Sequence, residues 1–184
     1  MDERSIEPAT ADDRDEAVAQ RSVFRVSERF ARRATFDAAS IRAFATLCGD
    51  RNPLHHDEQV ARASAFGTLI ASGPHVVALM MGLDATFLSE RSDAVGLGFE
   101  FRFVKAVPAG AELTLEWTIT DVTHKPSLAG DVVSVEGRAV DDAGVVYVSG
   151  TGRNLVRGQS GSPDRTGDPQ SIYHPRPSSR SAAT

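Results

Sequence analysis

Residues 49–55 read Gly-Asp-Arg-Asn-Pro-Leu-His and contain the residue types with the clearest chemical potential in the chain. Asp50 and His55 lie five positions apart within this segment. A carboxylate can take a proton from water, and an imidazole can hold or donate one near neutral pH. The glycine, asparagine and proline are turn residues, so they favour a loop of fixed shape. The segment therefore predicts an acid/base pair on a constrained loop.

The neighbouring residues have simpler interpretations. Asn52 is expected to brace the loop through side-chain to backbone hydrogen bonds. His56 is interpreted as solvent-facing or structural, and His75 as a helix residue near the mouth of a pocket. Cys48 is expected to be a small buried hydrophobe, because no partner pattern suggests a nucleophile. Asp50 alone would be interpreted as a turn residue, so its catalytic interpretation depends on the rest of the loop.

Composition limits the classes of protein to which the chain can belong. The 184 residues are 41% hydrophobic and 24% charged, which suits one globular domain with a core. The net charge of -5 argues against a general nucleic-acid binder. Cys48 is the only cysteine, and there is no long apolar run or apolar leader. We therefore expect no disulfide within the chain, no membrane span and a cytoplasmic location.

The ends of the chain differ from its middle. Residues 1–20 are rich in Asp, Glu, Arg and Ala, and residues 158–184 are rich in Ser, Pro, Gly and Arg. Neither segment has enough large apolar residues to offset the entropy lost on ordering. We expect two disordered tails around one folded domain over residues 21–157.

The helices of that domain are predicted mainly from their end signals. A strand is expected over residues 30–36, followed by a helix that begins after Asp37 and ends at Gly49. A second short helix is expected over residues 58–64. Ser72 and Pro74 are start signals for a third, which is apolar nearly all round and is expected to be buried.

The second half of the domain shows the alternation of strands. Residues 96–104 and 112–121 alternate apolar and other side chains, and strands are also expected around residues 133–135 and over 145–155. Residues 141–144, Asp-Asp-Ala-Gly, suit a hairpin turn. A long buried helix followed by an antiparallel sheet is an α+β arrangement.

Two segments resemble the signature of the MaoC-like, (R)-specific enoyl-CoA hydratases and acyl dehydratases. Residues 44–57 read Phe-Ala-Thr-Leu-Cys-Gly-Asp-Arg-Asn-Pro-Leu-His-His-Asp and match the family pattern almost completely. Residues 66–75 read Phe-Gly-Thr-Leu-Ile-Ala-Ser-Gly-Pro-His and depart from it, because Ser72 and Pro74 replace the usual His and Met. The resemblance implies a hot-dog fold, in which a curved antiparallel sheet wraps around a long central helix.

The resemblance also implies a reaction, the addition or removal of water at a 2-enoyl thioester. It assigns Asp50 as the general base and His55 as the residue that orients the water and helps deliver the proton. The backbone N–H of Gly73 is then placed to bind the thioester oxygen, and Ser72 to cap the helix or add a hydroxyl. Asn52, Ser72 and Gly73 are the substrate-binding candidates, and no metal or redox cofactor is expected. The basic candidates for coenzyme A contact, chosen by charge alone, are Arg51, Arg62, Arg102 and Lys105.

The resemblance further implies a homodimer or larger homo-oligomer that binds an acyl-CoA substrate. The sheet would otherwise have edge strands with unpaired backbone groups. Two alternatives remain open from the sequence. A thioesterase on the same fold would direct water at the carbonyl carbon, and a non-catalytic acyl-binding subunit would leave the acid/base pair unused. Fold alone does not choose among them.

Overall fold

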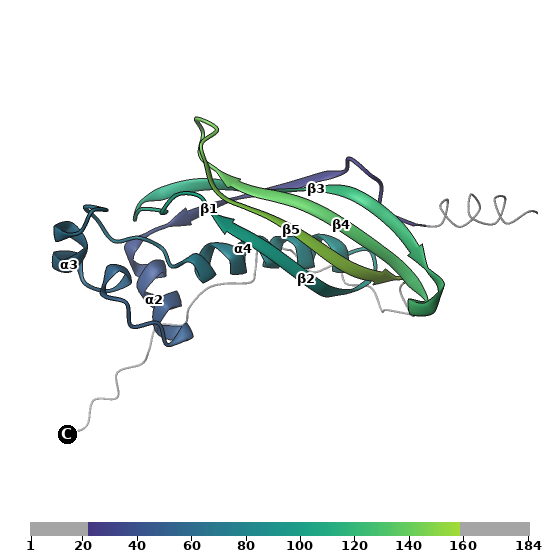
Figure 1. The fold of residues 1–184 in the computed structure, drawn as a ribbon, viewed down its shortest axis with the longest axis horizontal. Coiled ribbons are helices and arrows are strands. Elements are labelled where there is room, and N and C mark those ends of the chain that lie inside the picture. Colours follow the sequence, from purple (N-terminus) through teal and green to yellow (C-terminus); the bar gives the residue numbers. More distant parts are fainter. Residues whose placement is uncertain (1–21, 159–184) are drawn as a thin grey trace, which may run out of the picture.

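The computed structural model of the protein describes residues 22–158. The segments expected to be disordered tails, residues 1–20 and 158–184, lie outside the described residues except for Gly158. The described part forms one curved sheet, a long helix on its inner side and shorter helices beyond one end (Figure 1). Among the described residues, no helix is long and apolar enough to cross a membrane.

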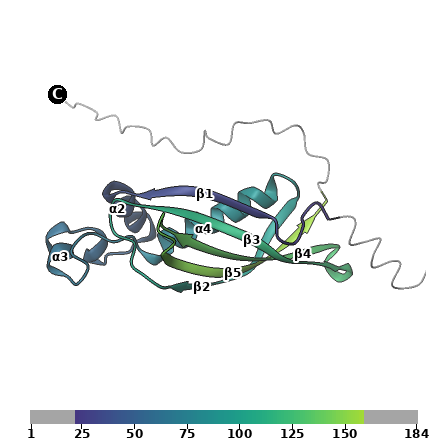
Figure 2. The ribbon, with the colours of Figure 1, turned by 90° about the horizontal axis from the view of Figure 1, so that it is seen from above.

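The sheet has five strands in the order β1-β3-β4-β5-β2, and each neighbouring pair is antiparallel. The long helix α4 lies in the hollow of the curved sheet, and the shorter α2 and α3 lie together beyond one end of it (Figures 1 and 2). The expected α+β arrangement is therefore confirmed. The elements in chain order are β1 (Arg29–Phe36), α2 (Ala38–Cys48), α3 (Glu58–Ala63), α4 (Gly73–Ser89), β2 (Asp93–Phe103), β3 (Ala111–Lys125), β4 (Gly130–Val140) and β5 (Val146–Arg157).

The helix ends follow their local sequence signals. Asp37 caps α2, and its side chain accepts a hydrogen bond from the backbone N–H of Ser40 at 2.8 Å. Gly49 ends α2 in the left-handed conformation with φ of 72°. Asp57 caps α3 by accepting from the backbone N–H groups of Gln59 and Val60. The predicted start and stop of α2 are thus confirmed, and α3 begins at Glu58 as predicted but ends at Ala63, one residue earlier than predicted.

Helix α4 is buried along one stripe, formed by every fourth residue. Val76, Met80, Asp84 and Leu88 are buried on this stripe, whereas Met81 is 39% exposed. The expected burial of α4 is therefore found on one side only, although its sequence is apolar nearly all round, because the sheet covers only that side. The buried Trp117 of β3 fixes the helix to the sheet by donating from Nε1 to the carbonyl oxygen of Met80 at 2.9 Å.

Strand β2 departs from the alternation that its sequence predicts. A bulge between Gly96 and Gly98 shifts its register against β5. Leu97, at the bulge, is 48% exposed, although the alternation groups it with Phe99. In β3, by contrast, Leu113, Leu115, Trp117 and Ile119 are all buried, as the alternation predicts.

Aromatic side chains of β2 pack on glycines of the neighbouring strand. A Cβ atom added to Gly150 would lie 2.5 Å from the ring of Phe101, and one added to Gly152 would also meet the ring of Phe99. The two rings are stacked, with centroids 6.0 Å apart. Glycine at these positions lets the rings lie against the inner surface of the sheet.

Two glycines with open surroundings provide a matched test of backbone geometry. Gly49 has a φ of +72°, whereas Gly82 lies in the middle of α4, and an added Cβ meets nothing within 4 Å at either position. Gly49→Ala should lower the free energy of unfolding by about 1–2 kcal/mol, because alanine is strained in the left-handed region. Gly82→Ala should raise it by up to about 1 kcal/mol through helix propensity. Urea unfolding of both variants measures the two changes in the free energy of unfolding. Equal changes would contradict the left-handed conformation assigned to Gly49.

Asp84 makes the stability depend on pH. Burial raises its pKa to about 6 from an ordinary value of 3.8, and a contact with Asn154 acts in the opposite direction. The folded state therefore holds the proton more tightly, so stability is complete at low pH and falls as the pH rises toward 6. The total loss is on the order of 3 kcal/mol.

Asp84→Asn removes this dependence because an amide does not ionise. Relative to the wild type, its free energy of unfolding should increase by on the order of 3 kcal/mol between about pH 4 and pH 7. Chemical denaturation of both proteins at several pH values measures the difference. A difference that stays constant over this range would show that Asp84 does not have the raised pKa.

Candidate functional site

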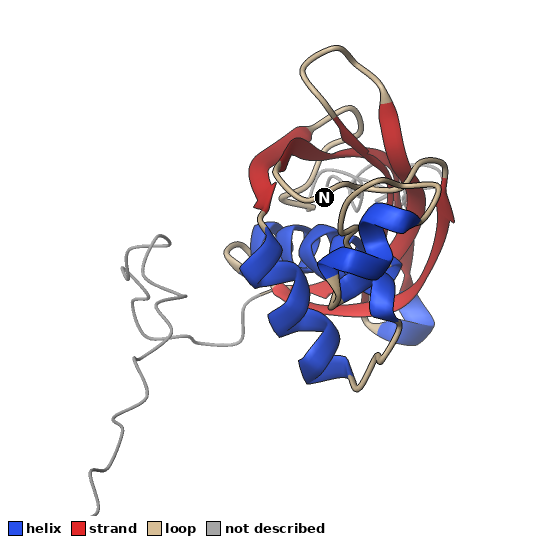
Figure 3. Cartoon of the chain, turned by 90° about the vertical axis from the view of Figure 1, so that its left-hand side faces the viewer, coloured by secondary structure: helices blue, strands red, loops and turns tan. Residues whose placement is uncertain are grey.

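Helix α2 ends directly before the loop that contains Asp50 and His55. The backbone N–H of Asp50 donates to the carbonyl oxygen of Ala45 at 2.9 Å, so the loop begins on the last turn of the helix. A short 3-10 turn, Pro53–His55, then brings His55 back toward Asp50. The predicted loop is thus a compact turn between two helices, at the end of the molecule that faces the viewer in Figure 3.

Three hydrogen bonds fix the shape of this loop. Oδ1 of Asp50 accepts from the backbone N–H of Asn52 at 2.9 Å, and Oδ1 of Asn52 accepts from that of Leu54 at 3.1 Å. The ring Nε2 of His56 donates to the carbonyl oxygen of Asp50 at 2.6 Å. The structural interpretations of Asn52 and His56 are confirmed. Because Oδ1 of Asp50 is held by the loop, its Oδ2 is the oxygen that faces His55.

His55 is held in one orientation by the segment that precedes α4. Its side chain is buried, and its Nδ1 lies 2.8 Å from the carbonyl oxygen of Ile70. A carbonyl can only accept, so Nδ1 carries a proton. In the neutral imidazole, Nε2 is then an acceptor, and it lies 3.5 Å from Oδ2 of Asp50. The side chain of Asp50 remains 33% exposed, so solvent reaches the pair.

Asp50 and His55 together favour a bound molecule that can donate a hydrogen bond to each of them. A carboxylate oxygen and an unprotonated ring nitrogen are both hydrogen-bond acceptors, so they do not satisfy each other. A water molecule has two O–H groups and can donate one to each. If Nε2 is protonated instead, it can donate to Oδ2 of Asp50 or to a bound molecule. The arrangement can therefore hold a water molecule and move a proton to or from it.

Backbone hydrogen bonds connect this pair to the start of α4. The N–H of Ile70 donates to the carbonyl oxygen of Leu54 at 3.2 Å, and that of Ala71 donates to Val107 at 2.8 Å. Gly73 follows Ile70 by three residues, so His55 and the N-terminus of α4 are neighbours. The structure thus places the loop residues and the predicted helix start next to each other.

The N-terminus of α4 offers one free backbone donor in its first two positions. Gly73 is the first residue of the helix, and its N–H has no partner within the helix. Pro74, at the second position, has no N–H. Ser72 occupies the cap position and is 3% exposed, but its side chain makes no capping hydrogen bond. The expected capping bond of Ser72 is thus not formed, and its hydroxyl is available for another partner.

Phe103 lies against Gly73, a contact that the sequence did not predict. A Cβ atom added to Gly73 would lie 2.7 Å from the ring of Phe103, so a larger residue does not fit there without a shift of the ring. Phe103 is nevertheless 60% exposed. It therefore forms an accessible aromatic wall beside the free N–H. The sequence predicted only that Phe103 lies in a strand whose side chains alternate between apolar and other types.

Two expectations for nearby residues were wrong. His75 is buried, its ring stacked on Phe44 with centroids 4.5 Å apart and edge-on to Phe36 at 5.2 Å. It is therefore part of the packing between α2 and α4 and not at a pocket mouth. Burial lowers its pKa, while Asp37 acts in the opposite direction. Cys48 is exposed, because it lies on the outer face of α2.

The basic residues chosen by charge are all exposed, and three of them already have partners. Arg62 pairs with Glu58 at 3.3 Å, and Nε of Arg102 lies 4.0 Å from Glu100. The amine of Lys105 lies 4.9 Å from the centre of the Tyr147 ring. These contacts are at the surface and are weak. All four side chains can therefore still reach an anionic ligand.

Three hollows lie on the outer face of the sheet, away from this site. Their volumes are about 220, 550 and 320 Å³, and neither Asp50 nor His55 lines any of them. The largest is lined by residues of β1, β3, β4 and β5, including Arg29, Glu116 and Arg138. The acid/base pair itself lies in an open position at the end of α4.

The comparisons with known proteins agree with this description. A family pattern described as MaoC like domain matches residues 20–140. A UPF0336 protein of Streptomyces avermitilis is 31% identical over 126 residues, 64% of this chain and 81% of that protein. An (R)-specific enoyl-CoA hydratase of Aeromonas caviae is 32% identical over 114 residues, 57% of this chain and 84% of that protein.

Solved structures give the same result. The MaoC-like dehydratase from Rhodospirillum rubrum superposes with a TM-score of 0.65 at 32% identity, covering 74% of this chain and 95% of that one. Residues 20–140, which the family pattern matches, contain the acid/base loop, α4 and strands β1 to β4. The family pattern extends over more than half of the sequence, and the observed sheet encloses α4 as the resemblance implied. This chain therefore belongs to the MaoC-like domain family and has a hot-dog fold.

Proposed function

We propose that the protein is a hydro-lyase that adds water to, or removes water from, a 2-enoyl thioester. In this proposal it is an (R)-specific enoyl-CoA hydratase or 3-hydroxyacyl-CoA dehydratase. The observation that carries the proposal is the 3.5 Å approach of Nε2 of His55 to Oδ2 of Asp50, with the opposite side of each group fixed by a backbone hydrogen bond. The similarity to the Aeromonas caviae hydratase supports it.

The reaction begins with a water molecule held between the two side chains. Its O–H groups point at Oδ2 of Asp50 and Nε2 of His55, which leaves an oxygen lone pair directed at the substrate. Asp50 takes one proton as the oxygen attacks the β-carbon of the double bond. His55 orients the water and helps return a proton to the α-carbon. The net change is addition of one water across the double bond, so the reaction is redox-neutral and calls for no electron carrier.

Negative charge forms on the thioester oxygen during the attack. The N–H of Gly73 is the donor proposed to bind that oxygen, because it is free and lies at the positive end of α4. Ser72 is placed to add a hydroxyl hydrogen bond, and Phe103 limits where the thioester can lie. In this proposal Asn52 acts through the loop, since its Oδ1 is already used by Leu54.

The first functional prediction concerns the acid/base pair. Asp50→Asn and His55→Ala should each fold and lose 10²–10⁴ in turnover, roughly the usual effect of losing a general acid or base. The measurement is the loss of enoyl-thioester absorbance with crotonyl-CoA. His124→Gln is the matched control, because His124 is also a histidine beside a carboxylate but pairs with Asp131 on the β3–β4 hairpin.

The assay also separates the alternatives. Wild-type turnover retained in folded Asp50→Asn would remove the central claim. Release of free thiol without loss of the double bond would identify a thioesterase. Absence of both reactions, with tight binding of the thioester, would identify a non-catalytic acyl-binding subunit.

We further propose that the working unit is at least a homodimer joined along β2. This strand is an edge of the sheet, and it and the residue after it expose large apolar side chains. Val95 is 55% exposed, Leu97 48%, Phe103 60% and Val104 62%. An open edge with apolar side chains is a site for pairing with another strand. Because Phe103 also borders Gly73, a second copy on β2 would cover the thioester site.

The second functional prediction tests this interface. Light scattering should give a mass of at least about twice 19.7 kDa, the mass of one chain. Val95→Arg should shift the protein toward monomer and reduce crotonyl-CoA hydration, because a charge on the edge opposes strand pairing. Val23→Arg is the matched control, because Val23 is also 55% exposed but lies outside the sheet. A monomeric wild type with full activity would show that the dimer is unnecessary.

A further inference from the structure

Two consecutive histidines approach Asp50 from different directions. Nε2 of His55 lies 3.5 Å from Oδ2 of the carboxylate, whereas Nε2 of His56 lies 2.6 Å from the backbone carbonyl oxygen. A carbonyl can only accept, so the ring of His56 donates this hydrogen bond. The bond is shorter than those that the side chains of Asp50 and Asn52 make within the loop. His56 is half-buried, and the reaction proposed above gives it no part.

The carbonyl that His56 binds controls the direction of the loop. It belongs to the planar peptide group that links Asp50 to Arg51. Fixing its oxygen therefore fixes that plane and the path of the chain toward Asn52. The backbone N–H of Asn52 in turn donates to Oδ1 of Asp50 at 2.9 Å. Rotation of the peptide group would move this N–H together with the carboxylate that it holds, so the ring of His56 sets where Oδ2 points.

His56 is itself held by both helices that flank the loop. Its N–H donates to the carbonyl oxygen of Pro53 at 3.1 Å, and its own carbonyl accepts from Nε of Arg42 at 3.1 Å. Nη2 of Arg42 pairs with Oε1 of Glu58 at 2.7 Å. Arg42 belongs to α2 and Glu58 to α3, so one guanidinium joins the two helices to the end of the loop.

We propose that His56 is a positioning residue for the reaction and that Arg42 acts through it. The proposal rests on the hydro-lyase function proposed above. His56 touches neither the water nor the substrate; it holds the peptide group that directs Oδ2 of Asp50. A water between Asp50 and His55 needs both acceptors at hydrogen-bond distance at once, so a small rotation of the carboxylate loses one of them. A misplacement of about 1 Å can cost about 10²-fold in rate.

Loss of the His56 bond should leave the protein folded. The N–H of Asp50 would still donate to Ala45, and Nδ1 of His55 would still donate to Ile70. The donor proposed to bind the thioester, the N–H of Gly73, belongs to α4 and not to the loop. The expected signature is therefore a fall in kcat with little change in KM and a melting temperature close to that of the wild type.

Three substitutions of His56 test the proposal with crotonyl-CoA. In His56→Gln the amide N–H reaches the place of Nε2, in His56→Asn it reaches only the place of Nδ1, and His56→Leu has no donor. The kcat of the Leu and Asn variants should fall by about 10–100-fold, and the Gln variant should keep most of the wild-type value. Equal kcat in the Gln and Asn variants would overturn the proposal, because the two amides differ only in reach.

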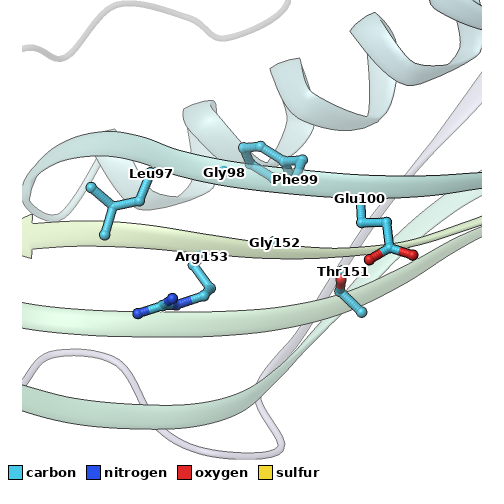
Figure 4. A pocket seen from close by; sticks show the side chains of 7 residues that line it. All are labelled: Leu97, Gly98, Phe99, Glu100, Thr151, Gly152 and Arg153. Atoms are coloured by element: carbon cyan, nitrogen blue, oxygen red, sulfur yellow. The ribbon is translucent and has the colours of Figure 1, made fainter.

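A double substitution tests the part given to Arg42. Arg42→Met should lower kcat less than His56→Leu does, and it should add little when the two are combined, because residues that act through one contact are not additive. Fully additive losses would overturn the role of Arg42. Arg153→Met is the matched control and should keep the wild-type kcat. Arg153 is exposed and points away from α4 into a shallow hollow on the outer face of the sheet (Figure 4).

The outcomes separate this proposal from the one on which it rests. Hydration by the wild type with an unchanged kcat in every His56 variant overturns the positioning role and leaves the hydratase intact. His124→Leu, on the β3–β4 hairpin, controls for the replacement of a histidine by leucine and should keep the wild-type kcat. If His56→Leu does not fold, the comparison of the Gln and Asn variants decides.

If the wild type does not hydrate crotonyl-CoA, the hydratase proposal fails, and crystal structures of the variants decide the positioning role. The distance from Nε2 of His55 to Oδ2 of Asp50 should stay near 3.5 Å in His56→Gln and increase in His56→Leu and His56→Asn. An unchanged distance in the Leu or Asn variant overturns the proposal.

Discussion

The hydrogen bond between Nδ1 of His55 and the carbonyl oxygen of Ile70 is the interaction on which the site depends. It decides which ring nitrogen carries the proton, so Nε2 is left to face Asp50. It also joins the loop after α2 to the segment that leads into α4, and the bond from Ile70 to Leu54 reinforces that junction. One buried contact therefore sets both the tautomer of His55 and the position of the pair near the N-terminus of α4. The surrounding loop bonds serve to keep this geometry.

The packing of α4 on the sheet fixes the relative position of the two segments that border the site, which are the start of α4 and the end of β2. Trp117 anchors Met80, so the helix cannot slide along the inner surface of the sheet without breaking a buried hydrogen bond. Glycines on β5 let the rings of β2 lie flat, and Phe103 at the end of that strand reaches the first turn of the helix. The strand that borders the site is also an edge strand with exposed apolar side chains. In the proposed dimer, β2 would therefore contact both the substrate and the second subunit.

Most of the architecture could be predicted because its signals are local. The cap at Asp37, the left-handed stop at Gly49 and the self-bracing loop around Asn52 each depend on contacts within a few residues. The alternation in the sequence of β3 also agrees with its observed burial, because one face of the sheet packs on the core along the whole strand. The pairing of Asp50 with His55 was visible for the same reason: both belong to one short turn.

The remaining features depend on which elements meet, and the sequence pattern does not encode that. The apolar sequence of α4 did not reveal that the sheet covers only one side of the helix. It also did not reveal that Asp84 is buried, because Asn154, which contacts Asp84, is seventy positions away in the sequence. His75 is buried because α2 packs over it, and Cys48 is exposed because nothing covers the outer face of that helix. The sequence by itself determined the helix ends, the strands and the reactive loop through short-range hydrogen bonds and alternation. The tertiary structure decided which side chains are enclosed and which atoms remain unpaired, because those follow from contacts between distant segments.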